Sequence, residues 1–275
     1  MSFLTIDQAK CNRDAICVSE CPSRVIEMKA NGGFPSLTAL AKDLCIQCGH
    51  CVAVCPEGAL SLEIMKPGEC PPVQKELLVS KEHMEHFIRS RRSVRTYKKI
   101  KVDHNIINRL IDIASYTPSI KNLQPVNWLV IENAGEVNRL ASIVVNWIRS
   151  MIQGEFEAKY SHSAMKLIVD KWQDGIDMIC HDAPHMIVAH GLKDSRASLL
   201  SSIIALTTLE LAAYSFGLGT CWAGYFYTAA NFYPPMIKAL NIPNNHQCFG
   251  ALMIGYPKFQ YYRIPLKKKP SITWR

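Results

Sequence analysis

The chain has 275 residues, of which 48% are hydrophobic and 20% are charged. It is therefore long and apolar enough to bury one large core, or one large and one small core, and intrinsic disorder is excluded. Its 14 glycines and 15 prolines exclude a collagen-like chain as well. The net charge is +8, but residues 1–65 carry 5 basic and 7 acidic side chains, so the rest of the chain carries +10. An acidic N-terminal part precedes a basic body.

The cysteine content indicates the redox environment. The chain holds 11 cysteines, an odd number, and no basic-then-apolar signal segment opens the sequence. These features disfavour a secreted disulfide scaffold. The most apolar stretch, residues 197–216, contains Glu210 and several Ser and Thr residues, so we expect a buried helix there and not a membrane span. We expect a cytoplasmic protein with no membrane partner.

An internal repeat occupies the N-terminal part. Aligning the chain with itself at an offset of 34 matches four identical positions and one substitution. The matched pairs are Cys11 and Cys45, Cys17 and Cys51, Cys21 and Cys55, and Pro22 and Pro56, and the substituted pair is Asp14 and Cys48. Three prolines and a glycine follow between residues 66 and 72. We therefore predict a duplicated small domain at 1–65, a stiff linker at 66–80 and a second domain at 81–275.

The cysteine spacing predicts two iron–sulfur clusters. Residues 45–56 read Cys-x2-Cys-x2-Cys-x3-Cys-Pro, the spacing of bacterial four-iron ferredoxins, in which the fourth cysteine binds the other cluster. Structural zinc on CxxC pairs is the alternative, but it leaves the third cysteine and the Cys-Pro of each half unexplained. We expect one [4Fe-4S] cluster on Cys45, Cys48, Cys51 and Cys21, and another that uses Cys11, Cys17 and Cys55.

Residues 5–64 resemble the two-cluster bacterial ferredoxins, which implies a small ferredoxin-like α+β domain. Asp14 departs from that family, which usually has a cysteine at this position. Two interpretations stay open. Asp14 either binds the first cluster through its carboxylate, which makes that iron more labile, or it is a solvated loop acid beside a [3Fe-4S] cluster or a cluster with a water ligand.

The body alternates predicted helices and strands, which indicates an α+β or α/β domain. Ser80 and Asp103 are predicted helix N-caps. A break is predicted at residues 217–220, where two glycines interrupt the pattern. Short apolar runs predict strands at 128–132, 186–190 and 248–254, and helical patterns lie at 136–150, 164–180, 195–216 and 236–240.

A basic run lies near the start of the body. Arg91, Arg92, Ser93 and Arg95 place three guanidinium groups and a hydroxyl within five residues. Guanidinium binds phosphate through paired hydrogen bonds, so this composition favours a phosphate site, and a solvated basic patch is the alternative. No GxGxxG or GxxxxGK motif occurs, so neither a Rossmann dinucleotide site nor an ATP-binding loop is supported.

Four downstream segments complete a pattern with this run, at residues 117–125, 183–188, 217–224 and 254–266. In this order and spacing, residues 84–268 resemble the FMN-dependent nitroreductase family. The resemblance implies an α+β sandwich, in which helices flank a central, mostly antiparallel sheet. It also implies an intertwined homodimer with FMN at the subunit interface.

The resemblance further implies the roles of individual residues. Arg91, Ser93, Arg95 and Arg263 would hold the phosphate and ribityl chain of FMN, with Arg92 as a further candidate. The isoalloxazine would meet a loop of the second subunit and a glycine-containing segment near its reactive nitrogen. The loop residues are Pro118, Ser119, Asn122 and Gln124, and the segment residues are Cys221, Trp222, Ala223 and Gly224. Each group also has a purely structural alternative. Residues 118–124 could form an ordinary loop, and the glycines before Cys221 could form a helix C-cap and a turn.

Together the two parts predict an iron–sulfur flavoprotein oxidoreductase. Clusters pass single electrons and FMN can deliver two, so the clusters would reduce FMN, which would reduce a small nitroaromatic, quinone or activated alkene. An external ferredoxin or NAD(P)H would be the donor, and no side chain is assigned as a general acid. Two alternatives stay open: an electron-transfer or redox-sensing protein without a dedicated substrate, and an NAD(P)H-driven nitroreductase with the clusters as electron outlet. A nucleic-acid partner, which the basic body permits, is not expected.

Overall fold

The computed structural model describes residues 3–154 and 161–275 of the chain. These residues form two compact units. Unit 1 comprises Met1–Val79 with the short stretch Lys121–Leu123, and unit 2 comprises Ser80–Ile120 and Gln124–Arg275. The boundary after Val79 lies at the end of the proline-containing segment 66–80.

Unit 1 consists of two copies of one helix–strand pattern. Helix α1 (Ile16–Glu20) and strand β2 (Ile26–Met28) correspond, after a shift of 34 residues, to α3 (His50–Val54) and β4 (Leu60–Leu62). Strand β4 pairs antiparallel with β1, and β2 pairs antiparallel with β3. The other elements of unit 1 are β1 (Leu4–Ile6), β3 (Pro35–Leu37), α2 (Ala41–Leu44) and the 3-10 turns Ala30–Gly32, Pro67–Glu69 and Lys75–Leu77.

The backbone of the two halves repeats in the same register. Three pairs of corresponding residues lie in the left-handed region, with φ between 51° and 75°. A left-handed residue turns the chain sharply, so each half folds the segment before its helix into a tight loop. The predicted duplication is thereby confirmed. The corresponding pairs are Arg13 and Gln47, Ala15 and Gly49, and Arg24 and Gly58, each 34 residues apart.

The core of unit 1 is small and includes cysteines. Leu4, Leu60 and Leu62 of the β1–β4 pair are at most 3% exposed and pack against three buried cysteines in one cluster. The strands have three residues each and the α-helices four or five. Such short elements bury little apolar surface. We therefore expect the predicted iron–sulfur clusters to contribute much of the folding stability of unit 1.

Unit 2 is built on a four-stranded antiparallel sheet. Its strand order is β5-β6-β8-β7, so the chain crosses over between sequential strands. The register sets Val130 opposite Ile187, and Cys221 opposite Met253. A bulge between Ala189 and His190 shifts the register of the β6–β8 pair. The strands are β5 (Asn127–Ile131), β6 (His185–Leu192), β7 (Gly219–Trp222) and β8 (His246–Gly255).

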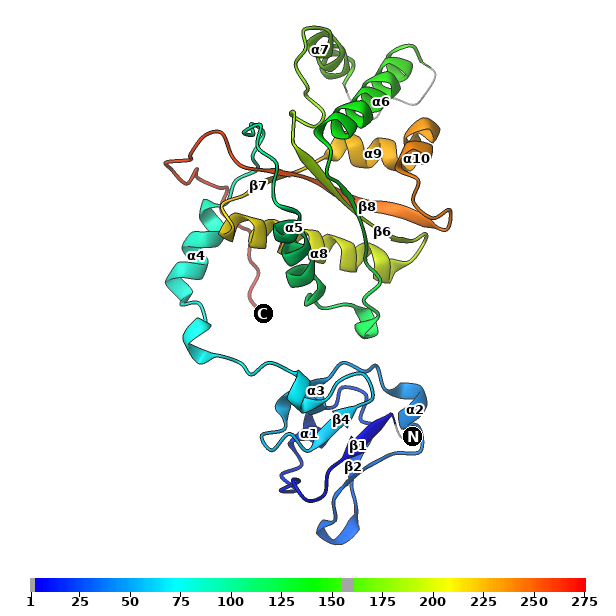
Figure 1. Ribbon diagram of the computed structural model, residues 1–275, viewed down its shortest axis with the longest axis vertical. Coiled ribbons are helices and arrows are strands. Elements are labelled where there is room, and N and C mark those ends of the chain that lie inside the picture. Colours follow the sequence, from blue (N-terminus) through cyan, green and yellow to red (C-terminus); the bar gives the residue numbers. More distant parts are fainter. Residues whose placement is uncertain (1–2, 155–160) are drawn as a thin grey trace. The chain divides into compact units, whose positions relative to one another are not determined.

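Helices cover both faces of this sheet (Figure 1). Met186 and Val188 of β6 point into one core with helices α6, α7, α9 and α10, whereas Ile187 and Ala189 point into the other core with α5 and α8. Strand residues alternate in this way because successive side chains leave opposite faces. The helices are α4 (Lys81–Ser90), α5 (His104–Ser115), α6 (Ala134–Ile152), α7 (His162–Gln173), α8 (Arg196–Ser215), α9 (Gly224–Phe232) and α10 (Pro234–Leu240), with a 3-10 turn at Ile120–Asn122.

The predicted α+β class and antiparallel sheet are confirmed, with three local differences. The helix expected over 164–180 ends at Gln173, because Gly175 turns the chain with a φ of 78° and the Asp177 carboxylate then accepts from backbone N–H groups. The break expected at 217–220 contains the start of β7. Helix α9 had no predicted counterpart.

Helix α8 is the one helix, within the described part of the chain, that is long and apolar enough to cross a membrane. Such a helix is also typical of a protein core. Leu206 and Leu209 are fully buried against the sheet, whereas Leu199 and Ile203 on another face are 37% and 41% exposed. The exposed side chains leave an apolar strip on unit 2.

Gly219 should be a sensitive position for the stability of unit 2. A Cβ atom there would lie 2.4 Å from Cγ2 of buried Val94, so we expect Gly219→Ala to lower the free energy of unfolding by about 1–3 kcal/mol. Gly224→Ala, where no atom lies within 4 Å of the added Cβ, is the matched control. All 5 tryptophans belong to unit 2, so denaturation followed by tryptophan fluorescence reports on this unit. Equal stability of the two variants would contradict the packing described here.

Candidate functional site

The predicted cluster ligands of unit 1 form two separate groups. In the first, Cys17 is buried and lies within electrostatic range of Cys11, Asp14 and Cys55. Burial raises the pKa of the Cys17 thiol, and negative charge on these three neighbours raises it further. The Cys55 sulfur also accepts a hydrogen bond from the backbone N–H of Ala59 at 3.3 Å.

The second group consists of Cys21, Cys45, Cys48 and Cys51, which line one small cavity with apolar neighbours such as Leu4. Burial raises the pKa of the Cys51 thiol to about 11, and the other three cysteines raise it in the same direction. The four cysteines predicted for one cluster thus come together, and so do the three predicted for the other, with Asp14 beside them. Cys21 and Cys55 each come from the opposite half of the repeat.

These donor sets suit iron–sulfur clusters. Buried thiols that surround one another resist ionisation, and a cluster compensates because its iron ions carry positive charge to the thiolates. Among the described residues, no three His, Cys, Asp or Glu side chains lie close enough to share a single metal ion. Asp14 occupies the position that corresponds to Cys48, and its Oδ1 accepts from the N–H of Ile16 at 3.0 Å. This bond fixes the carboxylate on the cluster loop.

In unit 2, the arginine run lies beside β7. Arg91 is the C-cap of α4, and the chain then pairs with β7 through a parallel bridge between Ser93 and Thr220. The N–H of Val94 donates to the Thr220 carbonyl at 2.9 Å. The Cys221 thiol is buried, which raises its pKa, and hydrogen bonds to Arg95 and Ser93 act in the opposite direction. Two predicted groups, the arginine run and the glycine-containing segment, are therefore neighbours.

An ion pair anchors the first arginine. Arg91 Nη1 lies 3.0 Å from Oε1 of Glu210 on α8, and the same oxygen accepts from the Thr220 hydroxyl at 3.2 Å. Glu210 is 7% exposed. In the sequence, Glu210 stands out only as an interruption of an apolar stretch, and no motif marks Thr220.

A cavity of about 420 Å³ opens next to this ion pair. Its walls include Arg91, Arg92 and Lys98, so its charge suits a phosphate or another anion. Tyr214 and Tyr261 add aromatic surface. Basic, hydroxyl and aromatic groups around one cavity fit the parts of FMN, which has a phosphate, a ribityl chain and a flat ring.

Four further residues predicted to bind FMN lie at or after the end of β7, or after β8, outside the arginine run. Trp222 is 37% exposed at the end of β7, Ala223 is the buried N-cap of α9, and Gly224 begins that helix. Arg263 lies in the exposed segment after β8. The segment from Trp222 to Gly224 therefore continues the chain from β7 into α9, whereas Arg263 follows β8.

The predicted loop residues Ser119 and Asn122 take part in hydrogen bonds. In unit 2, the Ser119 hydroxyl accepts from the N–H of Gln124 at 3.0 Å, and Pro118 lies next to it in the chain. In unit 1, the Asn122 side-chain amide donates to the carbonyl oxygens of Ile46 and Gln47 at 3.3 and 3.1 Å. The resemblance assigned these loop residues to the flavin of a second subunit.

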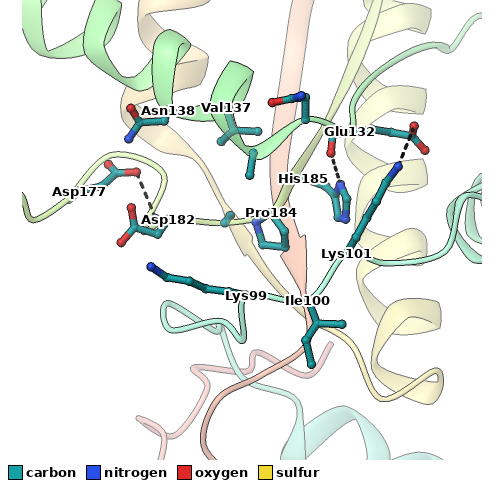
Figure 2. Close-up of a pocket in the computed structure, with 14 residues that line it drawn as sticks. Lys99, Ile100, Lys101, Glu132, Val137, Asn138, Asp177, Asp182, Pro184 and His185 are labelled. Carbon is teal, nitrogen blue, oxygen red and sulfur yellow. Dashed lines mark hydrogen bonds and ion pairs between the residues drawn. The ribbon is translucent and has the colours of Figure 1, made fainter.

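A further cavity of unit 2, of about 810 Å³, contains none of the predicted site residues (Figure 2). His185, Glu132 and Lys101 in its wall are bonded within the protein. The His185 ring bonds to the Val102 N–H at 2.8 Å and to the Glu132 carbonyl at 2.8 Å, and the Glu132 carboxylate pairs with Lys101. Burial lowers the pKa of His185, which favours the neutral ring that these bonds require.

Comparison with known proteins identifies one family in each unit. Residues 88–256 match the nitroreductase family, and residues 9–60 match a 4Fe-4S dicluster domain. The chain is 24% identical over 179 residues to a candidate NADH dehydrogenase/NAD(P)H nitroreductase of Methanothermobacter thermautotrophicus, covering 65% of this chain and 80% of that protein. It is 23% identical over 204 residues to a 5,6-dimethylbenzimidazole synthase of Rhodospirillum rubrum, covering 71% and 90%.

Solved structures show the same fold. A nitroreductase with bound FMN from Bacteroides fragilis superposes with a TM-score of 0.58 at 18% identity, covering 71% of this chain and 98% of that one. The family match spans most of unit 2, and the dicluster match spans most of unit 1 up to β4. The chain belongs to the nitroreductase family and carries an N-terminal 4Fe-4S dicluster domain.

Proposed function

We propose that this protein is an iron–sulfur flavoprotein oxidoreductase that passes single electrons from two [4Fe-4S] clusters of unit 1 to FMN of unit 2, and from there to a small organic acceptor. When bound, FMN supplies the exchange between one-electron and two-electron chemistry. The acceptor classes are nitroaromatics, quinones and activated alkenes. The observation that supports the proposal is that a chain of the nitroreductase family also has seven cysteines and Asp14 lying close together in two groups of four.

Unit 1 would hold the clusters through these two groups. Seven thiolates and the Asp14 carboxylate supply eight ligands, as two four-iron clusters require. We propose that Asp14 ligates the first cluster, because its loop repeats the backbone of the loop that carries Cys48. A carboxylate binds iron less tightly than a thiolate in this setting, so the first cluster would have one exchangeable corner.

Unit 2 would hold FMN beside β7. Arg91, Ser93 and Arg95 would bind the phosphate and ribityl chain, with Arg92 and Arg263 as further phosphate contacts. The segment from Cys221 to Gly224 would lie along the ring, where backbone N–H groups can stabilise negative charge on the reduced flavin. FMN in the structure from Bacteroides fragilis supports this choice of flavin.

We propose that the protein acts as a cytoplasmic homodimer with FMN at the interface. Leu199, Leu200, Ile203 and Ile204 form an exposed apolar strip on α8 that a second subunit would cover. The loop with Pro118, Ser119, Asn122 and Gln124 would then reach the partner's flavin. No membrane or nucleic-acid partner is part of this proposal.

The route of electrons can be tested with paired cysteine variants. Cys48→Ser removes a proposed ligand of the second cluster, whereas Cys70→Ser changes a cysteine of unit 1 outside both ligand groups. With a reduced bacterial ferredoxin as donor, we expect Cys48→Ser to lose most of the nitroaromatic reduction rate and Cys70→Ser to retain it. Equal FMN content in both proteins checks that unit 2 is intact. A full ferredoxin-driven rate without the second cluster would contradict the proposed route, and turnover with NAD(P)H alone would favour the alternative donor.

The phosphate assignment can be tested at Arg95, which is exposed, so its removal leaves no buried charge. We expect Arg95→Ala to weaken FMN binding by about 10- to 150-fold, because a charge-assisted hydrogen bond to the phosphate contributes roughly 1.5–3 kcal/mol. Iron and sulfide content should not change. Arg89→Ala, on the exposed Glu85 pair of α4, is the control. Fluorescence titration of the flavin-free protein measures both affinities, and an unchanged affinity in Arg95→Ala would refute the assignment.

The role of Asp14 can be tested by completing the thiolate set. We expect Asp14→Cys to retain about eight iron atoms per chain after mild oxidation in the presence of a chelator, whereas the unmodified protein should fall to about seven. Iron analysis and the EPR signal of a three-iron cluster give independent readings. Loss of the same iron from both proteins would show that Asp14 is not a ligand.

A further inference from the structure

Glu210 is a buried acid in an otherwise apolar helix. It is the only acidic residue of α8, it is 7% exposed, and its neighbours Leu206, Leu209 and Ala213 on the same helix are fully buried or nearly so. Moving a carboxylate out of water costs several kcal/mol unless it is paired and hydrogen-bonded. A leucine at this position would avoid that cost, so packing alone does not account for the acid.

The contacts of Glu210 join three parts of the proposed phosphate site. Its Oε1 lies 3.0 Å from Nη1 of Arg91 at the end of α4, and 3.2 Å from the hydroxyl of Thr220 on β7. Thr220 in turn accepts the backbone hydrogen bond of Val94 at 2.9 Å and bridges to Ser93. One carboxylate oxygen therefore links the helix end, the strand and the segment between the arginines.

Arg91 can bind a ligand and Glu210 at the same time. The guanidinium carries five N–H donors on three nitrogens, and the bond to Glu210 uses Nη1. The Arg91 side chain is 27% exposed and lines the cavity of about 420 Å³, whereas the Glu210 side chain is 9% exposed and lies behind it. In this ion pair, Glu210 is therefore the buried partner, and Arg91 is the partner that faces the cavity.

We infer that Glu210 is a positioning residue, which orients the Arg91 guanidinium toward the phosphate of FMN and so makes the site select FMN over riboflavin. This inference rests on the proposed function, because it takes the cavity beside Arg91 as the phosphate site. Glu210 itself does not contact the flavin.

Orientation and simple electrostatics predict opposite results at this position. If Glu210 acted only through its charge, removing that charge would make the site more positive and would strengthen the binding of a phosphate dianion. If it acts by orienting Arg91, the same change releases a flexible side chain and weakens phosphate binding. Riboflavin lacks the phosphate, so its affinity should respond to neither effect.

The test measures FMN and riboflavin affinity of full-length protein that retains its clusters and from which FMN has been removed, by quenching of flavin fluorescence. Glu210→Gln removes the charge at nearly constant shape, and Glu210→Asp keeps the charge but shortens the side chain. Both should weaken FMN binding by about tenfold and leave riboflavin binding unchanged. Glu85→Gln, which breaks the exposed pair with Arg89 on α4, should change neither affinity.

A double variant separates positioning from general damage to the fold. If Glu210 acts through Arg91, Arg91→Ala with Glu210→Gln should bind FMN no more weakly than Arg91→Ala alone, since the two effects are not additive. Unchanged or tighter FMN binding by both Glu210 variants would overturn the inference, as would an equal loss of riboflavin binding. Unmodified protein that does not prefer FMN to riboflavin would instead refute the proposed phosphate site, so the two failures are distinguishable.

Discussion

The site of unit 2 depends on one backbone contact between segments that are far apart in the sequence. The N–H of Val94 donates to the carbonyl of Thr220 at 2.9 Å, which places the arginine run along the edge of β7. Gly219 makes this contact possible, because a side chain there would take the place of Val94. Without it, the basic residues would be a charged surface and the glycine-containing segment a turn, which are the two structural alternatives for these motifs.

Unit 1 depends on a different constraint, the close grouping of its cysteines, four in one group and three with Asp14 in the other. Its strands and helices are too short to form a large core, and its buried cysteines do not ionise easily next to one another. Bonds between the thiolates and the iron ions of a cluster would cross-link the small core and would also stabilise the ionised form of the cysteines. Since the two halves share one backbone pattern, the substitution of Asp14 for a cysteine makes the two proposed clusters chemically unequal without changing the fold around them.

The sequence predicted the parts that are determined locally. Cysteine spacing fixed the repeat, and apolar runs located β5, β6 and β8, because these signals depend on neighbouring residues. The end of α7 depends on Gly175 and on the Asp177 turn, which periodicity does not show. The contact of Glu210 with Arg91 spans 119 positions, so only the fold could reveal it, although an acid in an apolar helix was the available signal. The ligand groups and flavin contacts stay predictions.

The central claim is that one chain carries both kinds of redox group and that they exchange electrons. An anaerobic reductive titration of the freshly purified protein, followed by visible absorbance, tests it most directly. If both kinds of redox group are present and exchange electrons, the protein takes up about four electrons per chain, one for each cluster and two for FMN, and the flavin and cluster bands change in the same titration. Uptake of two electrons or fewer, or a flavin band that stays oxidised while the clusters are fully reduced, would contradict it.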